Sequence, residues 1–331
     1  MKKSTALVLT FFTFFLWSCA KKPAAPQAGS AKAEDMMSLL PKEARGMIIV
    51  DVHRAMATEA AQKMLQEDKN YQKYQEFIQE TGIDPKKDVF FLAAAMGGEI
   101  GKEEAQQGVA VLNLKYNRDL LVSKIKKEGA KIQETDYNGV RLYQGIQMEA
   151  EEKPVSGAFL DDSNIVVGSD PFVRAVIDVY QKKADNILKN QEMAGLVKGM
   201  NKTAMVYGAF LVPPGALTEV ASKNPMLSPF ESITSVLLSF DYRDKVFEAE
   251  IKAQSADADK NKQMADALNG FKALGSAAAS KEPELAEVLN RLEIVSTPEH
   301  VRISISLPET LIDHLSQKLK AKPQEEKQEE N

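Results

Sequence analysis

One run of polar residues in this 331-residue chain has the spacing of a metal-binding loop. Asp257-Ala-Asp259-Lys-Asn261 imitates the opening of an EF-hand, in which carboxylate and amide oxygens bind calcium. That loop needs glycine at its sixth position and a bidentate acid at its twelfth, where this sequence has Lys262 and Leu268. The run therefore indicates the charged start of a helix rather than a calcium site.

Two further groups of titratable residues are candidates for catalysis or metal binding. Asp161 and Asp162 are adjacent carboxylates, but they fall at a predicted turn, where acidic residues are normally solvated. The histidines, His53, His300 and His314, lie on separate predicted elements without the i, i+4 spacing of a helical zinc motif. With a single cysteine in the chain, these residues predict neither a metal site nor a catalytic centre.

Motifs for a serine nucleophile or a phosphate-binding loop give no better support. The chain contains no Gly-x-Ser-x-Gly elbow, and Gly168-Ser169 fits the end of a strand before a helix cap. Gly97 to Gly101 lacks the strand and helix that flank a phosphate cradle, and we interpret it as a hairpin tip. We therefore expect a protein that is not an enzyme and has no cofactor. A hydrolase whose site is assembled from scattered residues is kept as an alternative.

The remaining reactive residue is Cys19, the only cysteine of the chain. Lys2 and Lys3 open the sequence, and a weakly polar to apolar run from Ala6 to Trp17 follows them. This run is shorter than the about 20 residues that a membrane-spanning helix needs. Its length suits the core of a secretory signal. We predict that residues 1–18 are a signal peptide and that the chain is exported.

The residues around this cysteine, Leu16-Trp17-Ser18-Cys19, resemble the lipobox of bacterial lipoproteins. The resemblance implies that Cys19 becomes the new N-terminus and carries a diacylglycerol thioether, usually with a further amide-linked chain such as palmitate. Two or more acyl chains attach a protein lastingly to a membrane. The protein would then be lipid-anchored in the bacterial cell envelope, outside the cytoplasm. Ala20 after the cysteine favours the outer membrane, facing the periplasm, by the sorting preference of enterobacterial lipoproteins.

One residue of this pattern departs from the lipobox. Trp17 stands where small residues are usual. Ser18-Cys19-Ala20 also fits the small-x-small site of ordinary signal cleavage after Ala20. A secreted protein without a lipid anchor therefore remains the alternative.

Composition divides the mature chain into four predicted segments. Residues 19–38 are read as a lipidated flexible tether, because Ala20 to Asp35 contains scarcely a bulky apolar side chain. Residues 39–200 and 201–322 are read as an N-terminal and a C-terminal α+β subdomain. Residues 323–331, rich in Glu and Gln, are read as a disordered acidic tail.

The charge balance limits the kinds of partner. The formal net charge is −5, and loss of Lys2 and Lys3 with the signal takes it to about −7. Such a chain has no basic field that would attract nucleic acid. An exported domain without disulfides must be stabilised by packing alone, which its length permits.

Hydrophobic periodicity predicts a recurring unit of two antiparallel strands followed by an amphipathic helix. Apolar residues alternate with polar ones from Val301 to Leu307, which is typical of a sheet with one wet face. We expect an α+β fold of duplicated units in two similar subdomains. The predicted strands are 47–52, 89–96, 108–116, 139–145, 155–160, 164–168, 203–212, 233–242, 245–253, 294–296 and 301–307. The predicted helices are 55–80, 119–128, 171–182, 256–274, 284–292 and 309–319.

The order of strands and turns resembles that of uncharacterised bacterial envelope domains. Their N-terminal unit opens with Leu-Pro and an apolar strand ending in Asp, as do Leu40-Pro41 and Ile48 to Asp51 here. The resemblance extends over Thr81 to Pro85, Tyr137 to Val140, Ala158 to Asp162, Gly168-Ser169 and Val176 to Asp178. It implies no known activity.

A proline-broken apolar stretch supplies the last candidate. Ala209 to Leu217, together with Pro225 to Phe230, could line a groove for a lipid or an unfolded segment, or could pack as a connection between subdomains. We therefore expect a membrane-tethered binding or envelope-scaffold protein without enzymatic activity. Its expected partners are the membrane, through the lipid anchor, and an envelope protein or an apolar ligand. A carrier or chaperone for an apolar ligand is the first alternative.

Overall fold

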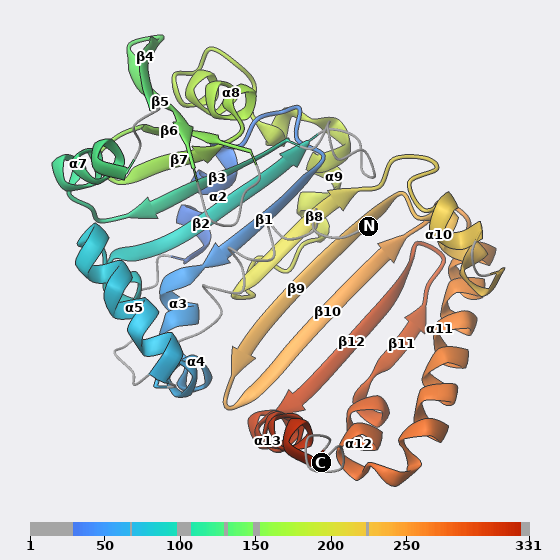
Figure 1. Ribbon diagram of the computed structural model, residues 1–331. Coiled ribbons are helices and arrows are strands. Elements are labelled where there is room, and N and C mark those ends of the chain that lie inside the picture. Colours follow the sequence, from blue (N-terminus) through green and yellow to red (C-terminus); the bar gives the residue numbers. More distant parts are fainter. Residues whose placement is uncertain are drawn as a thin grey trace. The chain divides into compact units, whose positions relative to one another are not determined.

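The computed structural model describes residues 29–66, 68–97, 107–128, 132–147, 153–222 and 225–325 (Figure 1). The predicted signal peptide, Cys19 and the last six residues of the predicted tail lie outside these ranges. The chain divides into two compact units, Met1–Leu211 and Val212–Asn331, called the first and the second unit below.

The first unit is built on eight antiparallel strands in the order β8-β1-β2-β3-β7-β6-β5-β4. Strand β8 pairs with β1, so the last strand of the unit lies beside the first. The strands are β1 (Gly46–Asp51), β2 (Val89–Gly97), β3 (Gln107–Leu114), β4 (Gln133–Tyr137), β5 (Val140–Ile146), β6 (Val155–Phe159), β7 (Asn164–Gly168) and β8 (Val206–Leu211).

One helix of the first unit precedes its strands, and the others follow strands singly or in short series. They are α2 (Gly29–Ser38), α3 (Val52–Met56), α4 (Glu59–Leu65), α5 (Asp68–Thr81), α6 (Pro85–Asp88), α7 (Arg118–Glu128), α8 (Asp170–Tyr180) and α9 (Gln191–Gly199), with the 3-10 turn η2 (Ile187–Lys189). Over the described ranges of both units, no helix is at once long and apolar enough to span a bilayer.

A row of buried side chains crosses one face of the sheet of the first unit. The strand register aligns Ile49, Ala93, Val111 and Val166 in one row across β1, β2, β3 and β7. Each of these side chains is at most 1% exposed. Helix α8 packs on β3, β6 and β7, and helix α2 on β1 and β2, so the core is closed by helices.

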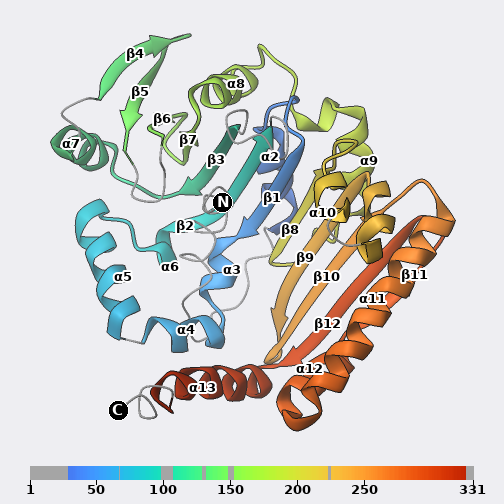
Figure 2. The same cartoon turned by 45° about the vertical axis from the view of Figure 1, so that its right-hand side comes forward.

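The second unit has four described strands in the order β11-β12-β10-β9, all antiparallel (Figure 2). They are β9 (Ser235–Arg243), β10 (Val246–Gln254), β11 (Glu293–Ser296) and β12 (His300–Pro308). The helical segments are α10 (Thr218–Ser222), η3 (Pro225–Ser232), α11 (Ala258–Ala278), η4 (Ala279–Lys281), α12 (Pro283–Arg291) and α13 (Glu309–Glu325).

The predicted α+β architecture of antiparallel strands and helices is confirmed. Two paired strands followed by a helix recur as β2-β3-α7, β6-β7-α8, β9-β10-α11 and β11-β12-α13. Local sequence fits these elements: Gly82 has φ +68° after α5, and Asp84 caps α6, which has Pro85 at its start. At the turn between β9 and β10, Asp244 and Lys245 have φ of 49° and 64°, as a type I′ hairpin requires.

Several elements of the structure differ from the prediction. The single helix predicted over 55–80 is three helices, because the chain turns at Thr58, whose hydroxyl accepts a hydrogen bond from the N–H of Ala61 and caps α4. Strand β4 was not predicted, because its side chains are polar and mostly exposed and give no apolar alternation. Helix α9 was not predicted either.

The boundaries of the segments also lie elsewhere than expected. The last ten residues of the predicted tether form α2, because Ala33, Met36 and Met37 on one side of it are at most 3% exposed. The first unit extends to Leu211 instead of residue 200, because β8 pairs with β1. Helix α13 continues to Glu325, into the predicted tail.

Candidate functional site

The run that imitates an EF-hand is the start of helix α11. The carboxylate of Asp257 accepts hydrogen bonds from the backbone N–H groups of Asp259 and Lys260, at 2.9 and 3.2 Å. Asn261 is fully buried, and its side-chain amide donates to the carbonyl oxygen of Pro298 at 2.8 Å. These oxygens and amides cap and anchor the helix, as its charged start indicates.

The adjacent carboxylates belong to the turn between β6 and β7. Asp161 accepts hydrogen bonds from the N–H of Ser163, at 2.7 Å, and from the side-chain amide of Asn164, at 2.8 and 3.0 Å. Asp162 is exposed. Asp161 therefore has the role of a turn-forming residue, as expected for this position.

The structure does not bring the three histidines together. The centroid of the His53 ring, on α3, lies 5.8 Å from the centroid of the Phe90 ring. Nδ1 of His300 is 3.2 Å from the hydroxyl of Thr297, and His314 is exposed on α13. Across the ranges that the structure describes, no group of three or more His, Cys, Asp or Glu residues could hold a metal ion.

The glycine motifs fall at strand ends. Gly168 ends β7, and Ser169 caps α8 without a side-chain bond to the helix; its hydroxyl donates to the carbonyl oxygen of Gly108 at 3.3 Å. Gly97 ends β2, and the rest of the predicted hairpin tip, residues 98–101, lies outside the described ranges.

The proline-broken apolar stretch contributes to packing. Its first residues, Ala209 to Leu211, belong to strand β8. Phe230 of η3 packs against the core cluster of the second unit, formed by Met264, Ala265 and Val301. Met226, by contrast, is 46% exposed. Phe230 is therefore part of a core rather than the wall of a groove.

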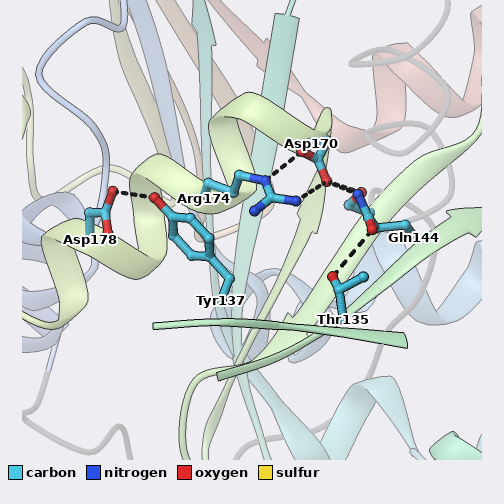
Figure 3. A network of polar contacts seen from close by, with 7 residues as sticks. Thr135, Tyr137, Gln144, Asp170, Arg174 and Asp178 are labelled. Carbon is cyan, nitrogen blue, oxygen red and sulfur yellow. Dashed lines mark hydrogen bonds and ion pairs between the residues drawn. The ribbon is translucent and has the colours of Figure 1, made fainter. Parts of the chain in front are cut away.

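A polar network joins the β4-β5 hairpin to helix α8 (Figure 3). Asp170, in the first turn of α8, accepts hydrogen bonds from Nε2 of Gln144 at 2.7 Å, the hydroxyl of Ser156 at 3.0 Å and Nε of Arg174 at 2.6 Å. Burial alone would raise the pKa of Asp170. The hydrogen bonds from Arg174, Gln144 and Ser156 outweigh the effect of burial, so the pKa of Asp170 lies below its ordinary value.

The same network continues one turn further along α8. The guanidinium of Arg174 lies over the ring of Tyr137, 4.7 Å from its centroid. The hydroxyl of Tyr137 donates to one oxygen of Asp178 at 2.8 Å, and the side-chain amide of Asn138 donates to the other at 2.7 Å. The hydrogen bond to Asp178, together with burial, raises the pKa of Tyr137.

This network holds the hairpin in place. Arg174 stays protonated and cannot act as a base, and its charge is already shared between Asp170 and the ring of Tyr137. Sequence reasoning missed the network, because Tyr137 and Asp178 are 41 positions apart. Only the i, i+4 pair of Asp170 and Arg174 gives a local signal.

The second unit presents an apolar sheet face that its own helices cover only in part. Strand register places the following side chains on this face, here called the open face: Val236, Leu238, Phe240 and Tyr242 of β9; Phe247, Ala249, Ile251 and Ala253 of β10; Val301, Ile303, Ile305 and Leu307 of β12. Met264 and Ala265 of α11 pack on it at Val301 and Ile303. Helix α11 runs along the β11 edge of this sheet (Figures 1 and 2).

The centre of the open face is accessible. Ile251, on the inner strand β10, is 44% exposed. The one hydroxyl among its side chains, that of Tyr242, is hydrogen-bonded to Glu309. On the opposite face, β10 and β12 are polar, with ion pairs between Lys252 and Glu250 at 2.9 Å and between Arg302 and Glu293 at 3.6 Å. The alternation predicted for Val301 to Leu307 is confirmed, but the apolar side is less covered than a closed core would be.

Comparisons with known proteins come from structure and from sequence. The Treponema protein TP0453 in crystal form III has a TM-score of 0.45 and 9% identity, over 83% of this chain and 95% of that chain. Crystal form I of TP0453 has a TM-score of 0.43 and 7% identity, over 84% of this chain and 94% of that chain. No curated protein sequence matches the chain. The family model for a protein of unknown function, DUF3352, matches residues 4–283, most of the chain, and the protein therefore belongs to this family.

Proposed function

We propose that this protein is a lipid-anchored binding protein of the bacterial envelope, without enzymatic activity, held outside the cytoplasm through Cys19. The support for the anchor is the sequence alone: a basic start, an apolar run and Leu16-Trp17-Ser18-Cys19 at its end. An Ala rather than Asp after the cysteine favours the outer membrane, with the folded units facing the periplasm.

The open face of the second unit is the proposed binding surface. A single observation carries this proposal: Ile251 is 44% exposed on an inner strand, in the middle of an apolar sheet face. Inner positions of a sheet are where a closed core would bury such a side chain. Covering exposed apolar area stabilises a complex by roughly 25 cal/mol per Å² before the costs of association.

The chemistry of the open face favours a ligand with a hydrocarbon part. The side chains of β9, β10 and β12 on this face are apolar apart from Tyr242, whose hydroxyl is bonded to Glu309. A sugar or an extended peptide would need hydrogen-bond partners that these side chains do not offer. The proposed ligand is therefore an acyl chain or the apolar side of an envelope protein.

Ligand binding can be tested with a pair of matched variants. Ile251→Glu puts a charge on the open face, and Val295→Glu puts the same charge at a residue that is 41% exposed on the opposite face of the sheet. We expect Ile251→Glu to lower the binding of a radiolabelled fatty acid or phospholipid at least about fivefold, because a charge next to hydrocarbon is costly. Val295→Glu should bind as the wild type does. Equal loss in both variants, or no binding by the wild type and no lipid found by native mass spectrometry, would argue against the carrier.

The kind of partner can be tested in the native envelope. A photoreactive amino acid at position 251 should crosslink to lipid if the protein carries a lipid, and to one envelope protein if it is a scaffold. The same amino acid at position 295 is the control for chance encounters. Crosslinking that is equal at the two positions would remove the open face as the binding surface.

The lipid anchor has its own test. Intact-mass analysis of the mature chain should show an acylated N-terminus at Cys19, and Cys19→Ser should release the protein from the membrane fraction. An unacylated chain that begins at Lys21 would contradict the anchor. This result would leave the proposal for the open face intact, because that proposal does not depend on lipidation.

A further inference from the structure

The turn of the β4-β5 hairpin consists of an asparagine followed by a glycine, Asn138-Gly139. Asparagine in this pair is chemically labile, because glycine has no side chain to shield its backbone nitrogen from the neighbouring side-chain amide. Both residues are exposed, and their φ angles of 55° and 82° are those of a type I′ turn. Water and base can therefore reach the atoms that would react.

Deamidation at this pair needs no reagent except water. The backbone nitrogen of Gly139 loses its proton to base and bonds to Cγ of Asn138, the bond from Cγ to Nδ2 breaks, and Nδ2 leaves as ammonia. Water then opens the cyclic imide at either carbonyl. The product is aspartate or, with one more methylene in the main chain, isoaspartate. The net change replaces an amide by a carboxylate, without oxidation or reduction.

Three hydrogen bonds restrain the atoms that take part in this reaction. Nδ2 of Asn138 donates to Asp178 of α8 at 2.7 Å, and Nε2 of Gln181, directly after α8, donates to the carbonyl oxygen of Asn138 at 2.9 Å. The N–H of Gly139 donates to a carboxylate oxygen of Asp136 at 3.0 Å. Imide formation removes Nδ2 and the proton of Gly139, so it must break the bonds to Asp178 and Asp136.

The charges around the turn oppose the same step. The attacking nitrogen is anionic, and a carboxylate that accepts a hydrogen bond from the neutral N–H disfavours the loss of its proton. The hydroxyl of Tyr137 donates to the other oxygen of Asp178 at 2.8 Å and holds this carboxylate in place (Figure 3). Contact of the hairpin with α8 therefore slows deamidation.

We propose that Asn138 is a site of spontaneous deamidation, and that docking of the β4-β5 hairpin on α8 controls its rate. The asparagine persists while it is bonded to Asp178, and it reacts when the hairpin leaves α8. The new carboxylate then faces Asp178 where an N–H had donated, and like charges at this distance repel each other. The change is irreversible, so the hairpin stays released. This inference does not rest on the proposed function.

The chain contains an internal control for this chemistry. A second pair of the same type, Asn269-Gly270, lies in the middle of α11. There the helix fixes the backbone, and α8 makes no contribution to it. A change that acts through α8 should therefore alter the rate at Asn138 and leave the rate at Asn269 as it is.

Peptide mapping by mass spectrometry measures both sites in the full mature chain, aged at mildly alkaline pH. We expect Asn138 to react at least about fivefold more slowly in the native chain than in the chain unfolded in urea. Asp178→Ala should speed the native reaction at Asn138 at least about fivefold and leave Asn269 unchanged. Asp162→Ala, which removes an exposed carboxylate of another turn, should change neither rate.

Two further variants test the hairpin itself. Tyr137→Phe removes only the hydroxyl bonded to Asp178 and should speed deamidation at Asn138 about twofold. Asn138→Asp imitates the product and should speed hydrogen exchange of the β4 amides at least about fivefold. Asn138→Gly loses the same bond but keeps the turn and adds no charge, so its effect on exchange should be smaller.

The outcomes that overturn the proposal are distinct. Asn138 reacting as fast in the native chain as in urea would show that the turn gives no protection. Unchanged rates in both Asp178→Ala and Tyr137→Phe would remove α8 as the control. If Asn269 also accelerates in Asp178→Ala, that variant is unfolded and Tyr137→Phe decides. Equal exchange in Asn138→Asp and the wild type would contradict release of the hairpin by the new charge.

Discussion

Helices α8 and α11 each follow a pair of antiparallel strands, but they cover their sheets to different extents. Helix α8 has 11 residues and buries five apolar side chains: Phe172, Val173, Val176, Ile177 and Val179. Helix α11 has 21 residues, of which Asn261, Met264 and Ala265 are buried. The bulky stripe of α8 closes a core, whereas the many alanine and glycine residues of α11 cannot fill one. The same strand-strand-helix pattern can therefore end in a closed core or in an open apolar face.

The largest expected effect comes from truncating a buried isoleucine of the first unit, compared with the same truncation on the open face of the second unit. Ile177→Ala should lower the free energy of unfolding of the first unit by about 2–5 kcal/mol, because Ile177 is fully buried. Ile251→Ala on the open face should cost less than about 1 kcal/mol in the second unit. Urea unfolding followed by far-UV circular dichroism measures both, since the one tryptophan, Trp17, falls in the predicted signal. Equal losses would mean that the open face is buried in solution.

The sheet beneath α8 should also tolerate little added volume. A Cβ atom at Gly168 would lie 2.3 Å from the carbonyl oxygen of Gly108, so Gly168→Ala must move backbone. We expect a loss of about 1–3 kcal/mol in unfolding free energy. Gly108→Ala is the control on the paired strand, where the nearest atom to the new Cβ is 3.6 Å away. If both variants lose the same free energy, the crowding at Gly168 is not the cause.

The polar network above α8 should make part of this stability depend on pH. The pKa of Asp170 is lowered in the folded state, so its contribution is complete above the ordinary aspartate pKa of about 3.9 and is lost as pH falls through the lower folded value. At pH 7 we expect Asp170→Asn to be less stable than the wild type by on the order of 1 kcal/mol. In urea titrations the difference should shrink towards pH 3. If Asp162→Asn, in an exposed turn, shows the same pH trend, the network of Asp170 is not its cause.

The smallest effect should come from α11 and have the opposite sign. A Cβ atom at Gly270 would have no neighbour within 4 Å. Gly270→Ala should therefore raise the unfolding free energy of the second unit by about 0.5–1 kcal/mol, because alanine is the better helix former. Gly195→Ala in α9 of the first unit, where the space is also free, should give a similar gain there. Destabilisation at Gly270 alone would reveal a tight contact on α11 in solution.

The sequence by itself determined the local elements of this protein. Alternating apolar residues, the charged helix start at Asp257 and the turn between the strands predicted over 233–242 and 245–253 all depend on neighbouring residues, and each was predicted in its place. The residue that caps this helix is Asp257. The α+β class followed from the recurrence of these local units. Helix α2 and strand β4 escaped prediction, because their own sequences are weak and contacts elsewhere in the chain stabilise them.

Only the tertiary structure decided how those elements are covered. Pairing of β8 with β1, the contact of Tyr137 with Asp178 and the burial of Tyr207 each join residues far apart in the sequence. The apolar alternation of β12 predicts a face that avoids water, but it does not say what will cover that face. Whether the face is covered depends on the size of the side chains on the following helix and on the position of that helix. For this reason α8 closes the core of the first unit, while α11 leaves Ile251 exposed.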